Sequence, residues 1–137
     1  MGRFRFTLER VLQVRVSQER AAATALAQAN QELANLRNRL EASLEGSRRV
    51  VQQVSEGVMD SALAWSLKSG LQLEVTRVHR AMEAQQTKVS ECTTTWQQAR
   101  RQLELLEKLR EARFKEYQRS EQLNQERSLD EWVIQSH

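Results

Sequence analysis

Very few side chains in this sequence are of the types that carry out acid–base, nucleophilic or metal chemistry. The histidines are His79 and His137, and Cys92 is the single cysteine. A metal centre needs several Cys, His, Asp or Glu side chains at fixed short spacings, and a phosphate-binding loop needs closely spaced glycines. Neither pattern occurs in the sequence. We therefore expect no catalytic residue, no metal, no cofactor, and a protein that is not an enzyme.

Cys92 has a simpler explanation than reactivity. It lies three residues after Val89 and four residues before Trp96, which is the spacing of one apolar face of a helix. A small side chain packed in such a face is more frequent than a thiolate nucleophile. Because a single cysteine cannot form a disulfide within the chain, a reducing compartment fits the sequence.

Neither a secretory signal nor a membrane span is predicted. Residues 1–7 lead into charged sequence, and no window approaches the ~18 uncharged apolar residues that cross a bilayer. We expect a cytoplasmic protein without direct membrane insertion.

The composition predicts helix over almost the whole length. The 137 residues include no proline and four glycines. An interior proline costs a helix about 3 kcal/mol, so its absence is typical of a chain that stays helical. With 39% hydrophobic and 28% charged residues, the chain is suited to a narrow apolar seam rather than a thick core.

Two stretches carry the heptad spacing of a coiled coil, with three polar interruptions. Each stretch is predicted to present one seam to a partner helix. The first seam comprises Leu12, Glu19, Leu26, Leu33, Leu40, Ser47 and Val54, together with Ala22, Ala29, Leu36 and Val50. The second comprises Val75, Met82, Val89, Trp96 and Leu103, together with Leu71, Val78, Gln85, Cys92, Ala99 and Leu106.

Helix-breaking residues cluster between the two seams. Gly57 predicts a helix C-terminal cap, and Asp60 predicts the N-cap of a short bridging helix that ends near Leu67. Ser69 and Gly70 then predict the start of a second long helix. Two arms of similar length around a central turn favour an antiparallel hairpin over a parallel dimer. We therefore predict an all-α fold, a single coiled-coil hairpin over residues 1–137. Its parts are helix 1 at about 7–56, a turn region at about 57–70, helix 2 at about 71–128 and a frayed tail at 129–137.

Charges of both signs are interleaved along the chain. There are 21 Lys and Arg residues against 18 Asp and Glu residues, a formal net charge of +3. Opposite charges four residues apart are typical of a solvated helix face. Because no uninterrupted basic stripe is present, we expect no nucleic-acid partner. The expected pairs are Glu45/Arg49, Glu104/Lys108 and Glu111/Lys115.

Some apolar residues lie outside the seams. Leu44, Val51 and Val58 repeat at seven-residue steps beside the first seam, close to the turn. They fit two interpretations, packing on the bridging helix with Trp65 and Leu67, or a docking patch for a partner. The sequence leaves both interpretations open.

Aromatic and basic side chains gather in residues 107–127, where the apolar stripe is weak. A solvated helix face explains much of this pattern, but arginine and aromatic residues are also typical of protein interfaces. The aromatic residues are Phe114 and Tyr117, and the basic ones around them are Lys108, Arg110, Arg113, Lys115 and Arg119.

Both ends of the chain carry a recognisable pattern. The opening run is Phe4-Arg5-Phe6-Thr7-Leu8-Glu9-Arg10-Val11-Leu12-Gln13-Val14-Arg15, followed by Glu19, Ala22 and an Ala/Gln/Leu-rich helix. The later run is Leu106-Glu107-Lys108-Leu109-Arg110-Glu111, with Arg113, Tyr117 and Glu126-Arg127-Ser128-Leu129-Asp130-Glu131. Together they resemble the flagellar export protein FliJ family. The resemblance covers nearly the whole length and includes the hairpin layout.

The resemblance implies a non-enzymatic central stalk of the flagellar type III export apparatus, peripheral at the cytoplasmic face of the inner membrane. It implies that the open end of the hairpin inserts into the hexameric flagellar export ATPase and promotes its assembly and activity. It further implies coupling to the cytoplasmic domain of the membrane export gate protein, and binding of export chaperones. By position, the ATPase-binding residues would be Phe4, Phe6, Leu8, Arg110, Arg113, Tyr117 and Arg119. The gate-binding residues would be Leu44, Leu71, Val75, Val78 and Met82.

Rival functions remain open at this point. The stalk protein of a virulence-type secretion system would fit the same physical pattern, and a generic coiled-coil scaffold would need no ATPase. A hairpin chaperone of the prefoldin type would need a β-rich segment between its helices, and residues 59–70 show no strand pattern.

Overall fold

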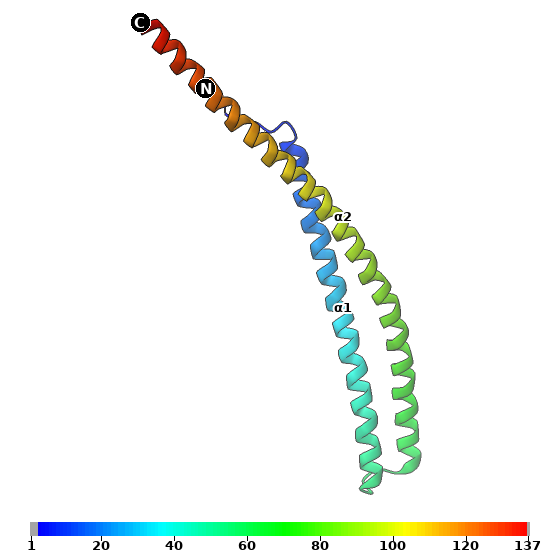
Figure 1. Cartoon of the computed structure of the whole chain (residues 1–137). Coiled ribbons are helices and arrows are strands. Elements are labelled where there is room, and N and C mark those ends of the chain that lie inside the picture. Colours follow the sequence, from blue (N-terminus) through cyan, green and yellow to red (C-terminus); the bar gives the residue numbers. More distant parts are fainter. Residues whose placement is uncertain (1–2, 137) are drawn as a thin grey trace. The chain divides into compact units, whose positions relative to one another are not determined.

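The computed structural model describes residues 3–136 and contains two long helices, α1 (Glu9–Ser55) and α2 (Ser61–Ser136) (Figure 1). The helices make up 92% of the structure and pack against each other, and the described residues form no strand. The predicted all-α helical hairpin is confirmed.

The chain divides into two compact units, each of which contains a piece of α1 beside a piece of α2. The first unit takes in residues 3–21 and 97–136 of the described chain, and the second takes in Ala22–Trp96, including the turn between the helices. Both helices run through both units. The first unit contains residues 9–21 of α1 and 97–136 of α2, and the second contains the rest of each helix.

Both predicted seams are confirmed, because every one of their positions is buried or half-buried. Val78 is the most enclosed, with 1% of its side chain exposed, and burial of such a side chain stabilises the fold by about 1.5–3 kcal/mol. Ser43 is also buried. The apolar pattern did not include it because serine is polar. It lies seven residues after Leu36 and seven before Val50, so its spacing is that of the seam.

Glu19, a charged interruption of the first seam, has a partner on the other helix. Its carboxylate lies 3.9 Å from the guanidinium of Arg100, which also lies 3.2 Å from Glu104. A half-buried carboxylate is tolerated at a seam position when a cation from the facing helix lies beside it.

The turn ends α1 in the way that its glycine predicts. Gly57 has a φ of 74°, a left-handed conformation that costs a residue with a side chain more than it costs glycine. Its N–H donates to the carbonyl of Val54 (3.1 Å), and the N–H of Val58 donates to the carbonyl of Gln53 (3.0 Å). These two bonds form a Schellman cap, which satisfies carbonyl groups at the end of the helix.

The turn is shorter than predicted, since α2 begins at Ser61 rather than near residue 71. The bridging helix is the first part of α2 itself, and the helix continues through Ser69 and Gly70. An interior glycine costs about 1 kcal/mol. A break there would also separate Ala64, 5% exposed, from the rest of its helix. The cost of the glycine is smaller than the cost of losing this packing and the backbone hydrogen bonds around it.

The end of α2 also differs from the prediction. The segment predicted as a frayed tail over residues 129–137 is helical to Ser136, while His137 lies outside the described residues. No glycine or proline follows Gly70, so the sequence contains no strong signal that would stop the helix earlier.

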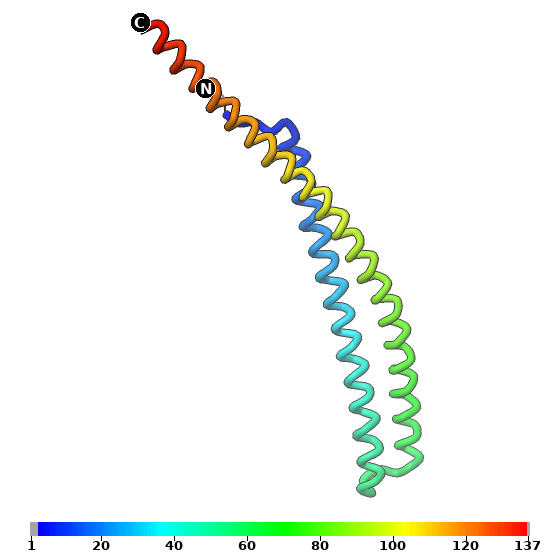
Figure 2. Tube along the Cα trace, in the orientation of Figure 1, coloured from blue at the N-terminus to red at the C-terminus, as the bar shows by residue number. Residues whose placement is uncertain are grey.

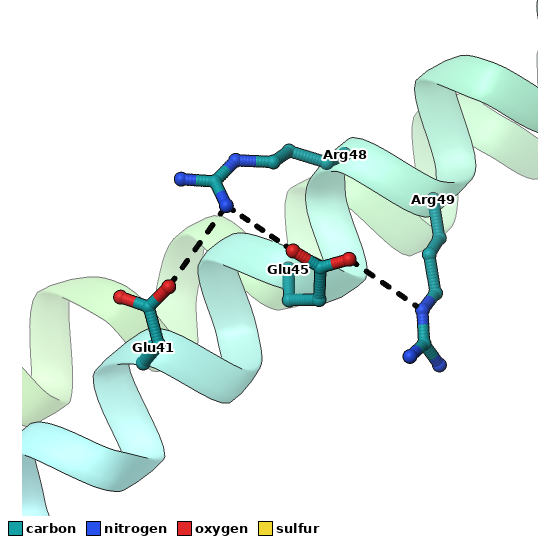
Figure 3. A network of polar contacts seen from close by, with 4 residues as sticks. All are labelled: Glu41, Glu45, Arg48 and Arg49. Atoms are coloured by element: carbon teal, nitrogen blue, oxygen red, sulfur yellow. Dashed lines mark hydrogen bonds and ion pairs between the residues drawn. The ribbon is translucent and has the colours of Figure 1, made fainter.

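Exposed ion pairs lie on the solvated faces of both helices. Figure 3 shows Arg48 on α1 between Glu45 (3.1 Å) and Glu41 (3.9 Å), with Arg49 3.8 Å from Glu45. Such pairs each stabilise a helix by about 0.3–0.5 kcal/mol. Of the predicted pairs, Glu45/Arg49 and Glu111/Lys115 are confirmed, whereas Glu104 pairs with Arg100 in place of Lys108.

Candidate functional site

Ahead of α1, residues 3–6 form no helix or strand, and Thr7 and Leu8 form a turn. The N–H of Glu9 donates to the carbonyl of Phe6 (3.1 Å), and the N–H of Leu12 donates to the carbonyl of Leu8 (2.8 Å). Residues 3–8, called the N-terminal segment below, lie beside α2 within the first unit (Figure 2). Their position is therefore set by side-chain contacts with α2.

Phe4 makes the central contact of this segment. Its ring meets Phe114 edge-on, with centroids 5.1 Å apart and planes at 67°, and it meets Tyr117 at 5.6 Å. The guanidinium carbon of Arg110 lies 5.9 Å from the centroid of the Phe4 ring. Edge-to-face aromatic pairs contribute about 0.5–1.5 kcal/mol beyond their burial, and an exposed cation–π contact contributes about 0.5–1 kcal/mol.

Arg110 also reaches the first residue of α1. Its Nε donates to the carboxylate of Glu9 at 3.0 Å, and the two side chains are 48% and 44% exposed. The ion pair is solvated, so its own contribution to stability lies within about 1 kcal/mol. A carboxylate in the first turn of a helix is also favoured by the helix dipole. One arginine thus contacts residues on both sides of the turn at Thr7 and Leu8.

A shallow hollow lies between the N-terminal segment and α2, inside the first unit. Its wall combines arginine, aromatic and small polar side chains, a composition typical of protein interfaces. The lining residues are Arg3, Phe4, Arg5, Phe6, Thr7, Arg113, Glu116, Tyr117 and Ser120.

The structure brings together most of the residues predicted for ATPase binding. Phe4, Arg110 and Tyr117 form the aromatic–arginine cluster, and Phe6 and Arg113 line the hollow beside it. The remaining two, Leu8 and Arg119, are exposed and do not line this hollow.

Two residues that contact this cluster were not among the predicted site residues. Phe114 meets the Phe4 ring, and Glu9 pairs with Arg110. The signal for Phe114 is present in the sequence, because Arg110, Phe114 and Tyr117 lie at i, i+4 and i+7 and so share one helix face. No comparable local signal marks Glu9, because it comes from the other helix.

The residues predicted for gate binding lie in the second unit and differ in accessibility. Leu44 is exposed, and Leu71, Val75 and Met82 are half-buried. Val78 is 1% exposed, so its side chain belongs to the packing between α1 and α2 and offers no surface to a partner. Its place in the predicted set is therefore wrong for the folded hairpin, because its side chain is fully enclosed, whereas Leu71, Val75 and Met82 lie in the same seam but keep part of their surface exposed.

Apolar side chains around the turn remain uncovered. Val58 and Trp65 are 74% and 73% exposed, and Val51, Leu63 and Leu67 are exposed as well. The interpretation that Val51 and Val58 pack on a bridging helix is thus wrong, because that segment is the first part of α2 and points its tryptophan to solvent.

A comparison with protein-family models shows to which family this chain is related. The family model for the flagellar FliJ protein matches residues 4–137, essentially the whole length. The chain belongs to the FliJ family. As a member of that family it is a non-catalytic component of flagellar export. No curated protein and no solved structure matches the chain.

Two kinds of feature are not found in the described part of this FliJ-family chain. Within residues 3–136, no group of three or more His, Cys, Asp or Glu side chains is placed to hold a metal ion. Over the same residues, neither helix contains a stretch that is long and apolar enough to cross a bilayer.

Proposed function

We propose that this chain is the central stalk of the flagellar type III export apparatus, and that its first unit inserts into the hexameric export ATPase. The observation that supports this proposal most is the hollow lined by Phe6, Arg113 and Tyr117, next to the aromatic–arginine cluster, in a chain of the FliJ family. Arginine and aromatic side chains are the residues that dominate binding energy at protein interfaces.

The stalk supplies no reactive group, so its effect on the ATPase comes from binding. A single helical pair inside a ring contacts each of the surrounding subunits differently. It therefore favours the assembled ring over free subunits and favours some subunit conformations over others. The expected results are promotion of hexamer formation and a faster rate of ATP hydrolysis.

The second unit would couple the ATPase to the cytoplasmic domain of the membrane export gate protein, at the cytoplasmic face of the inner membrane. Leu44, Leu71, Val75 and Met82 are the gate-facing residues in this proposal, without Val78 because it is buried. Export chaperones are proposed as further partners.

The test is the rate of ATP hydrolysis by the flagellar export ATPase of the same organism, with and without the purified chain, together with the sedimentation of the ATPase. A higher rate with hexamer formation is the supporting outcome. Absence of both binding and stimulation contradicts the stalk function.

A matched pair of variants locates the surface. Arg113→Ala with Arg119→Ala removes two exposed arginines from the first unit, and Arg77→Ala with Arg80→Ala removes two exposed arginines from α2 in the second unit. We expect the first variant to require about tenfold more protein for half-maximal stimulation, as for the loss of ~1.4 kcal/mol at an interface. The second variant should behave as the unmodified chain. Equal behaviour of the two variants would exclude this surface.

A further inference from the structure

We infer that Arg110 and Phe4 are positioning residues, which form a clip that holds the N-terminal segment on α2 and thereby shapes the hollow beside Arg113. In this view Arg110 acts on a partner through the segment and not by touching the partner. The effect of Arg110 on a partner rests on the proposed stalk function, whereas the holding of the N-terminal segment on α2 does not.

The contacts of Arg110 carry the inference. Its Nε binds the carboxylate of Glu9 at 3.0 Å, and its guanidinium lies 5.9 Å from the centre of the Phe4 ring. Glu9 follows the N-terminal segment and Phe4 lies near its start. The same side chain therefore fastens the segment at two points that are five residues apart in the sequence.

Phe4 also holds the segment through ring contacts of its own with α2. Its ring lies 5.1 Å from Phe114 and 5.6 Å from Tyr117, so three side chains of α2 surround it. Residues 3–6 have no helix or strand of their own that would hold them in place. Without the clip, their conformational freedom opposes any fixed position on α2.

The clip places the residues between its two anchors. Phe6 and Thr7 lie between Phe4 and Glu9 in the sequence, and both line the hollow together with Arg113 and Tyr117. Part of the wall of the hollow thus exists only while the segment is held. A partner that binds in the hollow therefore depends on Arg110 without contacting it, whereas Phe4 both holds the segment and lines the hollow.

Arg113 provides the comparison, because it lies on the same helix three residues after Arg110 and is exposed. It lines the hollow but is not among the contacts of the Phe4 ring or of Glu9. Removal of Arg110 should therefore loosen the segment, and removal of Arg113 should not.

The structural test uses the free protein. Tyr117 is the single tyrosine, and once the three phenylalanine rings are assigned, a nuclear Overhauser effect between its ring and that of Phe4 reports their contact. We expect this effect to be weakened in Arg110→Ala, and amide exchange over residues 12–14 to become about fivefold faster in Arg110→Ala and in Phe4→Ala. Arg113→Ala should leave the ring contact and the exchange unchanged. Arg110→Lys keeps a cation near both anchors and should restore most of the protection. Unchanged exchange and ring contact in Arg110→Ala would overturn the clip.

The functional test is a double-mutant cycle on the stimulation of the export ATPase. If Arg110 acts only through the segment, adding Arg110→Ala to Phe4→Ala causes no further loss, whereas adding Arg113→Ala causes a further loss of about the size of its own effect. Full additivity of Arg110→Ala and Phe4→Ala would mean direct contact of Arg110 with the partner and would overturn its positioning role. If the unmodified chain fails to stimulate the ATPase, the proposed function fails, and the ring contact and the exchange still decide whether the clip exists.

Discussion

The side-chain amide of Gln85 on α2 donates a hydrogen bond to the backbone carbonyl of Ala29 on α1, with 2.9 Å between Nε2 and the oxygen. Gln85 is the polar interruption of the second seam, and Ala29 is 2% exposed. The short side chain of Ala29 lets the amide approach the facing backbone. A polar residue at one seam position thus finds its partner only in this alignment of the helices, which is how single polar seam residues specify register.

Loss of the Gln85 contact should destabilise the hairpin. Gln85→Ala removes the hydrogen bond and half-buried packing, and we expect the free energy of unfolding to fall by about 1 kcal/mol. Urea denaturation measures the change. The matched control is Gln86→Ala, one residue later and exposed, where alanine should be neutral or slightly stabilising because of its higher helix propensity. Equal effects of the two substitutions would mean that the bond to Ala29 contributes nothing.

Replacement of glycine by alanine should have opposite effects on stability at Gly70 and at Gly57. Gly70 lies inside α2 with open space where a Cβ would be, so Gly70→Ala should stabilise the protein by up to about 1 kcal/mol. Gly57 has a φ of 74°, so Gly57→Ala should destabilise it by about 1 kcal/mol. Thermal unfolding followed by circular dichroism measures both. A stabilising Gly57→Ala would show that the cap described above does not form in solution.

Gly46 allows α2 to approach closely. A Cβ at Gly46 would lie 3.4 Å from both terminal carbons of Leu71, at the edge of ordinary van der Waals contact. Gly46→Val should therefore destabilise the hairpin by about 1–3 kcal/mol through overpacking. Leu71→Ala should recover part of this loss in the double variant, because the residues share one space. Strict additivity of the two effects, measured by urea denaturation, would contradict the close approach.

Three consecutive threonines should weaken α2 locally. The hydroxyls of Thr93, Thr94 and Thr95 donate to the carbonyl four residues earlier, at 2.8, 3.1 and 3.0 Å. Such bonds compete with the helix ladder, and threonine has a lower helix propensity than alanine. Thr94→Ala with Thr95→Ala, both at exposed positions, should raise the free energy of unfolding by about 1 kcal/mol and slow amide exchange over residues 91–99. Faster exchange there would refute this explanation.

The tryptophans should report their different environments. Trp96 is half-buried in the second seam, whereas Trp65 and Trp132 are 73% and 67% exposed. In variants that keep one tryptophan and replace the others by phenylalanine, acrylamide should quench Trp96 least. Addition of a partner that covers the turn should protect Trp65 alone, and equal quenching of all three would contradict the seam.

Much of the fold could be predicted because heptad spacing and helix caps are local properties. The seams followed from the seven-residue repeat, and the cap at Gly57 followed from the left-handed conformation that glycine tolerates. The restart at Ser69 and Gly70 was wrong because local propensity was weighed without the packing of Ala64 on the same helix. Periodicity correctly placed Val78 in the seam, and its assignment to a docking surface, which followed from its position under the family resemblance, was wrong because the folded hairpin buries it.

The sequence by itself determined that this chain is helical, that it turns near Gly57 and that each helix has one apolar seam, because backbone propensity and side-chain spacing act within a few residues. Only the tertiary structure decided which residues meet across the helices. The pairing of Gln85 with Ala29 and the clip of Phe4, Arg110 and Glu9 join residues 56 to 106 positions apart. Such contacts depend on the register of the hairpin, which is set by the fit of the whole seam and by the length of the turn.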